Sequence, residues 1–452
     1  MTFWEEGVDM WKLPLDGESG RVLEGILKEA LRKVRGDVVV KDNLAVVDDY
    51  IVIKGRKVRI EGDIYILAIG KASVAMAKGA EDVLGDRIKG GLVVTKYGFS
   101  MPLKMCRVIE AGHPIPDENG LKAARLAFDL VRGLSEGDIL LVLISGGGSA
   151  LLPAPDGITL RDKMFVTDLL LKSGATIQEI NCVRKHLSFL KGGKLRKAAY
   201  PAKVVTMVLS DVIGNDLSSI ASGPTFADST TFEDAVNVLR RYGLWDRVPL
   251  SVRRHLQEGV EGRAQETLKP EDEDMNRSIT EIIGDNRYFC NVLCEAARKA
   301  NISPVHFTSF VEGEAREVAK VIAAVVKEYL FRRENTPKLL IFGGETTVRI
   351  KGNGKGGRSQ ELALSLAVSM SGWKGYRVVS ISTDGNDGPT DAAGAVVDDT
   401  TLVRAHEKGL NPLSYLDDND SYHFFDELKN LVFTGPTQTN VNDVVVALVG
   451  YD

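Results

Sequence analysis

The chain has 452 residues, which is enough for two or three domains. A hydrophobic content of 44% and a charged content of 26% are typical of a globular protein. The net charge of -5 gives no argument for a nucleic-acid or membrane partner. No apolar run approaches the roughly 18 residues that span a bilayer, and residues 1–9 lack the pattern of a signal peptide. We therefore expect a cytoplasmic protein without a nucleic-acid or membrane partner.

The first part of the chain predicts a parallel sheet. Residues 18–36 have the periodicity of an amphipathic helix, and the alternation over 37–60 predicts an antiparallel ribbon. Buried apolar runs then alternate with helical patterns, which predicts a doubly wound α/β sheet. The expected strands are 63–69, 91–96, 106–110, 139–144 and 203–209, and the expected helices are 74–83, 118–133, 159–173, 176–200, 231–241 and 249–258.

An acidic stretch at 261–274 interrupts this pattern, and we expect a linker there. Alternation resumes beyond it, so we predict two α/β domains, residues 1–262 and 276–452, with the loops at the strand ends facing one cleft between them. The expected elements of the second domain are strands 279–283, 303–308, 338–342, 346–351, 376–382 and 430–434 and helices 286–300, 313–330, 360–370 and 400–408.

A glycine turn follows the apolar run 139–144. Its residues are Ser145, Gly146, Gly147, Gly148 and Ser149. Three glycines let the backbone adopt positive φ and approach a ligand closely. Successive N–H groups in such a turn can bind an anion, and ligands of open α/β sheets bind at the carboxyl ends of strands. The alternative is a tight turn between strand and helix that binds nothing.

Two basic residues occupy similar places. Lys71 follows the strand 63–69, where it could meet an anion, although a solvated turn lysine is the alternative. Arg358 ends the tract 352–358, which holds Gly354, Gly356 and Gly357. A mobile glycine tract with a guanidinium suits a polyphosphate, and a flexible hairpin tip is the alternative. The spacing is not the GxGxxG of a dinucleotide site, and no P-loop motif occurs.

Carboxylates also follow several of the strands. They are Asp211, Asp216, Glu345, Asp384 and Asp387. Mg²⁺ bound with a nucleotide takes a few oxygens from protein and the rest from phosphate and water, so these residues suit such a site. Turn formation and helix capping are the alternative roles. Together the glycine turns, the two cations and the carboxylates favour phosphoryl transfer over hydrolysis or hydride transfer.

The chain resembles the class II glycerate kinases, also called glycerate 2-kinases or the MOFRL family. The resemblance covers nearly the whole chain in order; the only departure seen is Ser359, where the family often has Asn. The matching segments are 68–73, 110–117, 143–151, 181–194, 210–216, 221–225, 343–347, 354–361, 383–391 and 435–440.

The resemblance implies a Rossmann-like N-terminal domain, a smaller C-terminal domain and ATP-dependent phosphorylation of D-glycerate at its 2-hydroxyl. It implies that Lys71 and Arg358 are the leading catalytic residues, and that Glu345, Asp384 and Asn440 line the cleft.

We therefore expect a monomeric or homodimeric kinase that uses ATP, D-glycerate and Mg²⁺ or another divalent metal such as Mn²⁺. The turn 145–149 and the tract 352–358 would bind phosphate or carboxylate, with the acceptor's carboxylate or the transferred phosphate favoured for the turn. The predicted metal ligands are Asp211, Asp216, Asp384 and Asp387. A hydroxypyruvate reductase, a kinase of another small hydroxy acid or sugar acid, and a non-catalytic binding module are the alternatives.

Overall fold

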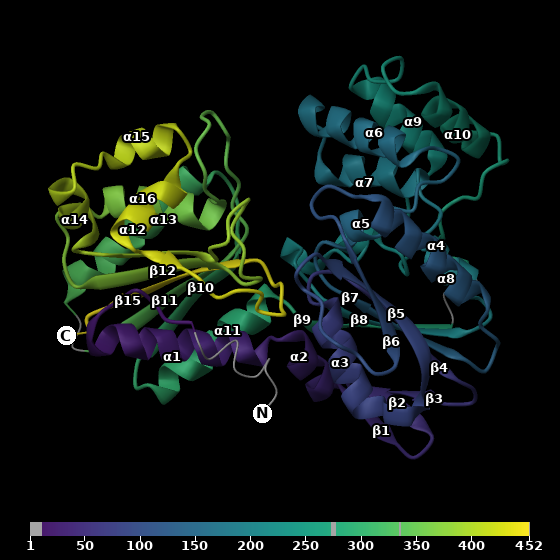
Figure 1. Cartoon of the computed structure of the whole chain (residues 1–452), viewed down its shortest axis with the longest axis horizontal. Coiled ribbons are helices and arrows are strands. Elements are labelled where there is room, and N and C mark those ends of the chain that lie inside the picture. Colours follow the sequence, from purple (N-terminus) through teal and green to yellow (C-terminus); the bar gives the residue numbers. More distant parts are fainter. Residues whose placement is uncertain (1–10, 273–276, 334–335, 452) are drawn as a thin grey trace. The chain divides into compact units, whose positions relative to one another are not determined.

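The computed structural model describes residues 11–272, 277–333 and 336–451. Residues 1–9, where the sequence predicts no signal peptide, lie outside the described part. The chain forms two compact units (Figure 1). We call residues 36–283 the parallel-sheet unit, and residues 1–35 together with 284–452 the mixed-sheet unit.

The parallel-sheet unit is built on a six-stranded sheet of order β6-β5-β4-β7-β8-β9. From β4 the chain moves outward to β6, then returns to β7 beside β4 and moves outward again. All pairings from β6 to β8 are parallel. The switch point of this doubly wound sheet therefore lies between β4 and β7, where ligands of such folds bind. The strands are β4 (Ile64–Ile69), β5 (Ile88–Lys96), β6 (Cys106–Ala111), β7 (Ile139–Ile144), β8 (Lys203–Leu209) and β9 (Ser278–Gly284).

Helices surround this sheet, and a separate helical group extends beyond it. The helices α6, α7, α9 and α10 share their own apolar core, and Figure 1 shows them side by side. Thr159, Thr176 and Thr231 start three of them with capping boxes, which satisfy the first backbone N–H groups. The helices of the unit are α2 (Gly36–Asn43), α3 (Ser73–Leu84), α4 (Glu118–Arg132), α5 (Gly148–Leu151), α6 (Leu160–Ser173), α7 (Ile177–His186), α8 (Lys194–Ala199), α9 (Phe232–Arg241) and α10 (Leu250–Val260).

The mixed-sheet unit has strand order β10-β11-β15-β12-β13-β14. The strand β15 is buried along its whole length and runs antiparallel to both of its neighbours. In Figure 1 the helices α1 and α11 cover one face of the sheet, and α12, α13 and α16 cover the other. The strands are β10 (Ser303–Val311), β11 (Lys338–Gly344), β12 (Tyr376–Ser382), β13 (Gly394–Asp398), β14 (Leu431–Val432) and β15 (Asp443–Val449). The helices are α1 (Gly17–Lys33), α11 (Asn286–Lys299), α12 (Ala315–Arg332), α13 (Arg358–Ser369), α14 (Thr401–Glu407), α15 (Pro412–Asp417) and α16 (Ser421–Leu428).

The α/β class and the two-part organisation are confirmed, and the predicted domain bounds, 1–262 and 276–452, stay a prediction. Helix α1 packs against α11 and so belongs with the C-terminal half, because its buried apolar stripe needs that partner. The acidic stretch is attached to the parallel-sheet unit: Leu268 is buried, and its N–H donates to the carbonyl of Gly192. Strand β9 then adds an edge to the parallel sheet. The predicted cleft between the domains stays a prediction.

Three local expectations were wrong. The ribbon expected over 37–60 is limited to β1 (Leu44–Val47), β2 (Tyr50–Ile53) and β3 (Arg56–Arg59), because residues 36–43 form α2. This helix packs closely on α3, where Gly79 leaves room for the backbone of Asp37. The helix expected over 176–200 is broken at 187–193. Residues 346–351 form a single bridge, from Thr347 to Glu314, in place of a strand.

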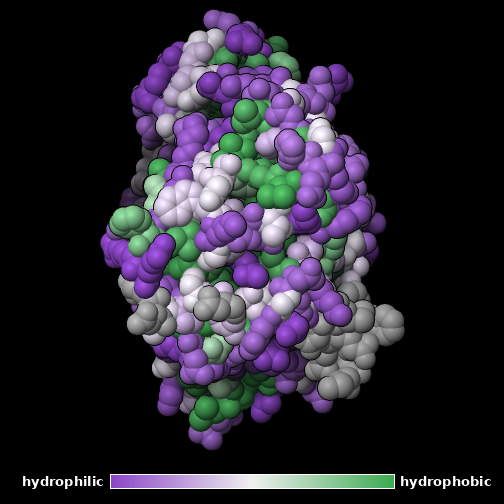
Figure 2. Space-filling model, turned by 90° about the vertical axis from the view of Figure 1, so that its left-hand side faces the viewer, coloured by the Kyte–Doolittle hydropathy of each residue, from purple (hydrophilic) through white to green (hydrophobic). Residues whose placement is uncertain are grey.

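The surface has no wide apolar band in the view of Figure 2, where hydrophobic side chains gather in small patches among hydrophilic ones. Among the described residues, no helix is both long and apolar enough to cross a membrane.

We predict that Leu27→Ala destabilises the mixed-sheet unit. Leu27 is fully buried on α1, and truncating a buried leucine costs about 2–5 kcal/mol. Hydrogen exchange should show lost protection in residues 284–452 and little change in 36–283. The control Val321→Ala removes a side chain that is 66% exposed on α12, and should change stability by less than about 0.5 kcal/mol. Loss of protection confined to 36–283 would contradict the placement of α1.

Candidate active site

The loops that follow β4 and β7 are joined at the switch point. The N–H of Lys71 donates to the carbonyl of Gly146 over 2.9 Å, and the N–H of Ala72 donates to Ser145 Oγ over 3.0 Å. Gly70 has a φ of +127°, and a Cβ there would lie 2.2 Å from Ser145 Oγ. Ser145 is fully buried and ties the two loops together, and ligand binding by it stays a prediction.

The glycine turn carries Lys71 beside it. Gly147 has a φ of +89°, and a Cβ there would lie 3.0 Å from the ring of His113 and 3.4 Å from Lys71 Cγ. The side chains of Lys71 and His113 therefore flank this glycine closely. The structure thus brings Lys71 and the turn 145–149 together, as the sequence predicts. His113 belongs to the loop after β6 and was not among the predicted site residues.

A second loop, which contains Ala221 and Ser222, contacts the glycine turn. The hydroxyls of Ser149 and Ser222 share a hydrogen bond of 2.8 Å, and Ser222 Oγ donates to Asn181 Oδ1 over 3.4 Å. Ala221 and Ser222 both have positive φ, 51° and 59°, which costs about 1–3 kcal/mol for each non-glycine residue. Such strain is typical of functional sites. Sequence reasoning did not predict this loop as part of the site. The available signal was the Ser-Gly-Pro at 222–224, which comes after the buried strand 203–209.

Basic side chains lie behind these loops. Lys191 Nζ donates to the carbonyl of Ala221 over 3.0 Å and is buried. Burial, and then the positive charge of Arg184, hold the pKa of Lys191 well below its usual range. Burial and the charges of Lys191 and Arg184 do the same for the pKa of Lys163. A bound anion would oppose this effect and favour the charged amines, so the arrangement suits an anionic ligand.

The carboxylates after β8 serve the backbone of their own loop. Asp216 accepts hydrogen bonds from the N–H and the hydroxyl of Ser218 and from the hydroxyl of Ser219, at 2.6–3.1 Å. Although burial opposes it, these hydroxyls lower the pKa of Asp216. The structure therefore gives Asp216 the turn-forming role that was the alternative. Asp211 lies at the start of the same loop, directly after Ser210.

In the mixed-sheet unit, Arg358 is held between two carboxylates. Its Nη2 lies 3.1 Å from Asp443 Oδ1, its Nε bonds the other oxygen of Asp443, and its Nη1 bonds Glu345. Asn442 Nδ2 donates to Glu345 over 2.8 Å. Against the effect of burial, Asp443 and Glu345 raise the pKa of Arg358. A guanidinium has five N–H donors, so two remain beyond the three used here.

Asp443 was not predicted from the sequence. It begins β15, opposite Gly344 of β11 and Ser382 of β12, so the sheet places it where three strands meet. Burial raises the pKa of Asp443 to about 6, Arg358 opposes this, and Glu345 and Asp384 add to it. The available signal was an acidic residue at the start of the apolar run 444–449, shortly after the predicted Asn440.

Asp387 caps the helix that carries Arg358. Its two carboxylate oxygens accept from the N–H groups of Ser359 and Gln360, at 3.0 and 2.8 Å. Burial and the charge of Asp443 raise the pKa of Asp387 to about 7. Asp384 Oδ1 accepts from Ser382 Oγ and from the N–H of Asn386, at 3.0 and 2.9 Å. The contacts of Asp387 are therefore those of a helix cap, and the contacts of Asp384 are those of a turn. Both are the alternative roles named above for these carboxylates.

The four predicted metal ligands are divided between the two units. Asp211 and Asp216 belong to the parallel-sheet unit, and Asp384 and Asp387 belong to the mixed-sheet unit. Within the described residues, no group of three or more His, Cys, Asp or Glu side chains could hold a metal by itself. Metal binding by any of the four stays a prediction.

Hydrogen bonds anchor the glycine tract 352–358, and its mobility stays a prediction. Its backbone N–H groups up to Lys355 donate to Asp418, Asn419 and Asp420. A Cβ at any of its glycines would lie 2.3–2.4 Å from residues 418–421 or from Asp387. The glycines permit close packing of the tract against the α15–α16 connection. The predicted Gly354, Gly356 and Gly357 therefore position Arg358, and phosphate binding by them stays a prediction.

Asn440 lies in the loop that precedes β15. This loop is fixed to the end of β12, because Thr383 Oγ1 accepts from the N–H of Val441 over 2.9 Å and the N–H of Thr383 donates to the carbonyl of Asn442 over 3.0 Å. Asn440 is 6% exposed. The loop thus places Asn440 in the same strand-end region of the sheet as Asp384, and the role of both in lining a cleft stays a prediction.

We predict that Gly70→Ala disrupts the joint at the switch point. A side chain at position 70 would be strained by the positive φ and would clash with Ser145. Gly98→Ala is the matched control, because Gly98 has a φ of +80° and no atom lies within 4 Å of the position that its Cβ would take. The control should cost about 1–2 kcal/mol through φ alone, and Gly70→Ala clearly more, measured by urea unfolding. Equal costs would show that the contact with Ser145 is unimportant.

Comparison with known proteins agrees with these features. Residues 22–257 match a family described as a domain of unknown function, DUF4147, and residues 338–443 match the MOFRL family. The chain is 44% identical over 428 residues to glycerate 2-kinase of Pyrococcus horikoshii, covering 94% of this chain and 96% of that protein. It is 44% identical over 426 residues to D-glycerate 2-kinase of Thermotoga maritima, covering 93% and 99%.

A solved structure also matches over almost the whole chain. The crystal structure of glycerate kinase from Thermotoga maritima superposes with a TM-score of 0.81 at 42% identity, covering 95% of this chain and 99% of that one. The resemblance found in the sequence is therefore confirmed, and the chain belongs to the class II glycerate kinases of the MOFRL family.

Proposed function

We propose that this protein is a glycerate 2-kinase, which transfers the γ-phosphoryl group of ATP to the 2-hydroxyl of D-glycerate and releases 2-phosphoglycerate and ADP. The observation that carries the proposal is the joint between Lys71 and the glycine turn at the switch point. It holds a lysine beside an anion-binding type of loop at the place where α/β sheets bind ligands. The similarity to kinases of glycerate supports the same conclusion.

In this mechanism Lys71 and Arg358 stabilise the negative charge that the transferring phosphoryl group spreads over its oxygens. A cation that acts mainly in the transition state accelerates phosphoryl transfer by about 10³–10⁵. Asp443 and Glu345 fix the orientation of the Arg358 guanidinium, so that its remaining N–H groups have a defined direction. Pre-orientation of this kind avoids reorganisation during the reaction.

A divalent metal, Mg²⁺ or Mn²⁺, fits this chain as a companion of ATP. Mg²⁺ bound with a nucleotide needs only one or two protein carboxylates, and the loops that follow β8 and β12 carry such residues. Asp211, Asp216, Asp384 and Asp387 are the residues proposed to hold the ion, directly or through water. When bound, it would neutralise charge on the phosphates.

We predict 2-phosphoglycerate as the product from ATP, Mg²⁺ and D-glycerate. Phosphorus NMR of the reaction mixture distinguishes it from 3-phosphoglycerate without a coupling enzyme. Formation of 3-phosphoglycerate would contradict the proposed acceptor hydroxyl. The control is incubation with NADH and hydroxypyruvate, where a hydroxypyruvate reductase would consume NADH and a kinase leaves its absorbance unchanged.

We predict that Lys71→Ala lowers kcat by at least about 10³ while the protein stays folded, because Lys71 contributes charge at the turn and is not part of the core. The matched control is Lys89→Ala, in the same sheet. Lys89 has a side chain that is 62% exposed and lies 3.7 Å from Asp63, a weak surface pair. Its turnover should equal that of the wild type. Near-wild-type turnover of Lys71→Ala would remove Lys71 from the mechanism.

For Arg358 the informative change is to lysine. Arg358→Ala would leave Asp443 buried without its partner, at a cost of about 3–5 kcal/mol, and would mix stability with catalysis. Arg358→Lys keeps the charge but loses the planar fork. We expect a large fall in kcat with a nearly unchanged unfolding midpoint, whereas Arg349→Lys, at an exposed position of the same unit, should change neither. An active Arg358→Lys enzyme would show that charge alone suffices.

A further inference from the structure

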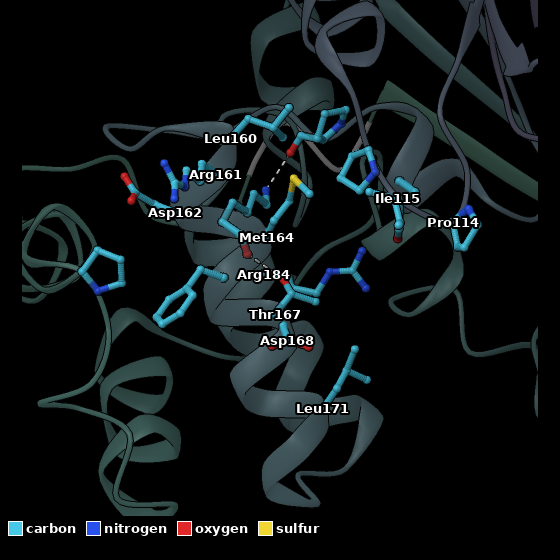
Figure 3. A pocket seen from close by; sticks show the side chains of 17 residues that line it. Pro114, Ile115, Leu160, Arg161, Asp162, Met164, Thr167, Asp168, Leu171 and Arg184 are labelled. Carbon is cyan, nitrogen blue, oxygen red and sulfur yellow. Dashed lines mark hydrogen bonds between the residues drawn. The ribbon is translucent and has the colours of Figure 1, made fainter. Parts of the chain in front are cut away.

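The parallel-sheet unit contains a pocket of about 780 Å³ beside the glycine turn. Figure 3 shows it between helix α6 and the loop that follows β6. Ser149, the last residue of the turn, lines the pocket, so the pocket continues directly from the predicted anion site. Its walls are mainly apolar and include Pro114, Ile115, Leu160, Met164, Phe165 and Leu171.

The two acidic side chains that line this pocket are engaged by neighbouring residues, whereas the side chain of one arginine has no such contact with the described residues. Asp162 is engaged by the capping box of Thr159 and by Ser251 Oγ, and Asp168 pairs with Lys172 at 2.7 Å. Arg184 also lines the pocket, and in Figure 3 its side chain extends toward Ile115. Within the described residues, no hydrogen bond or ion pair engages its guanidinium. The pocket thus combines apolar walls with a positive charge that has no carboxylate partner there.

The size and chemistry of the pocket exclude D-glycerate as its main occupant. D-glycerate has three carbons, each bearing oxygen, and gives apolar walls nothing to bury. Pockets of about 300–1,000 Å³ with apolar walls and a few polar groups hold ligands of drug or cofactor size. A nucleotide fits both the apolar walls and the positive charge of the pocket. Its base can stack on apolar or guanidinium groups, and its phosphates can bind Arg184 and the turn.

We propose that this pocket binds the nucleoside of the phosphoryl donor, with the phosphates directed past Arg184 and Ser149 to the turn 145–149. The inference rests on the proposed kinase function. It assigns the turn to ATP, in contrast to the sequence-based preference for the acceptor's carboxylate. The acceptor then meets the far end of the phosphate chain, near Lys71.

The test is calorimetric binding of ADP with Mg²⁺ to the full chain. In Ile115→Glu a side chain that is 67% exposed becomes an anion at the pocket, so folding is not at risk. We expect its Kd for ADP to rise at least tenfold while the KM for D-glycerate stays unchanged. Val260→Glu is the matched control: Val260 is 51% exposed on α10 and does not line the pocket, so ADP binding should stay that of the wild type.

A second variant distinguishes binding of the base from binding of the phosphates. Arg184→Gln should raise the Kd for ADP at least tenfold. The Kd for adenosine, which has no phosphates and binds more weakly, should stay unchanged. If Ile115→Glu raises the KM for D-glycerate and not the Kd for ADP, the pocket serves the acceptor and the inference fails. It also fails if Ile115→Glu leaves ADP binding intact but changes the oligomeric state by light scattering, since the pocket then joins two copies of the chain.

The two proposals can fail separately. If the wild type binds ADP through Ile115 and Arg184 but does not phosphorylate D-glycerate, the acceptor assignment is wrong and the nucleotide pocket stands. If it phosphorylates D-glycerate while both variants bind ADP normally, the kinase stands and the pocket assignment is wrong.

Discussion

The close approach of Gly70 to Ser145 is the constraint on which the parallel-sheet unit's site depends. Only a residue without a side chain fits there, because a Cβ would lie 2.2 Å from Ser145 Oγ at a φ of +127°. The contact joins the ends of β4 and β7 through two hydrogen bonds to the turn. Lys71 and the glycine turn therefore share one base, which is what the proposed charge-stabilising site needs.

The mixed-sheet unit fixes its catalytic candidate differently, through buried charge. Arg358 begins α13, whose first N–H groups are capped by Asp387, and its guanidinium is held by Asp443 and Glu345. Burial raises the pKa values of Asp387 and Asp443, to about 7 and about 6, so these carboxylates depend on their contacts for the charged state. The resulting network orients the arginine but leaves part of its donors for a ligand.

These two arrangements divide the work of the proposed kinase in a simple way. The parallel-sheet unit has a pocket large enough for a nucleoside beside the turn, and it holds Lys71 and His113 against Gly147 of that turn. The mixed-sheet unit offers a pre-oriented guanidinium among carboxylates. In the proposed mechanism, Lys71 and Arg358 each contribute positive charge that stabilises the transferring phosphoryl group.

The sequence by itself determined the α/β class and the strand-end loops, because uninterrupted apolar runs and glycine-rich turns are local patterns. Its resemblance to the class II glycerate kinases determined the family and made Lys71 and Arg358 the catalytic candidates. Only the tertiary structure decided that α1 belongs with the C-terminal half, that Asp443 holds Arg358, and that Asp216 and Asp387 serve backbone N–H groups. It also showed that tract 352–358 is anchored by residues 418–421. These outcomes depend on contacts between residues distant in sequence, and no local pattern encodes which partner a carboxylate or a helix face will find.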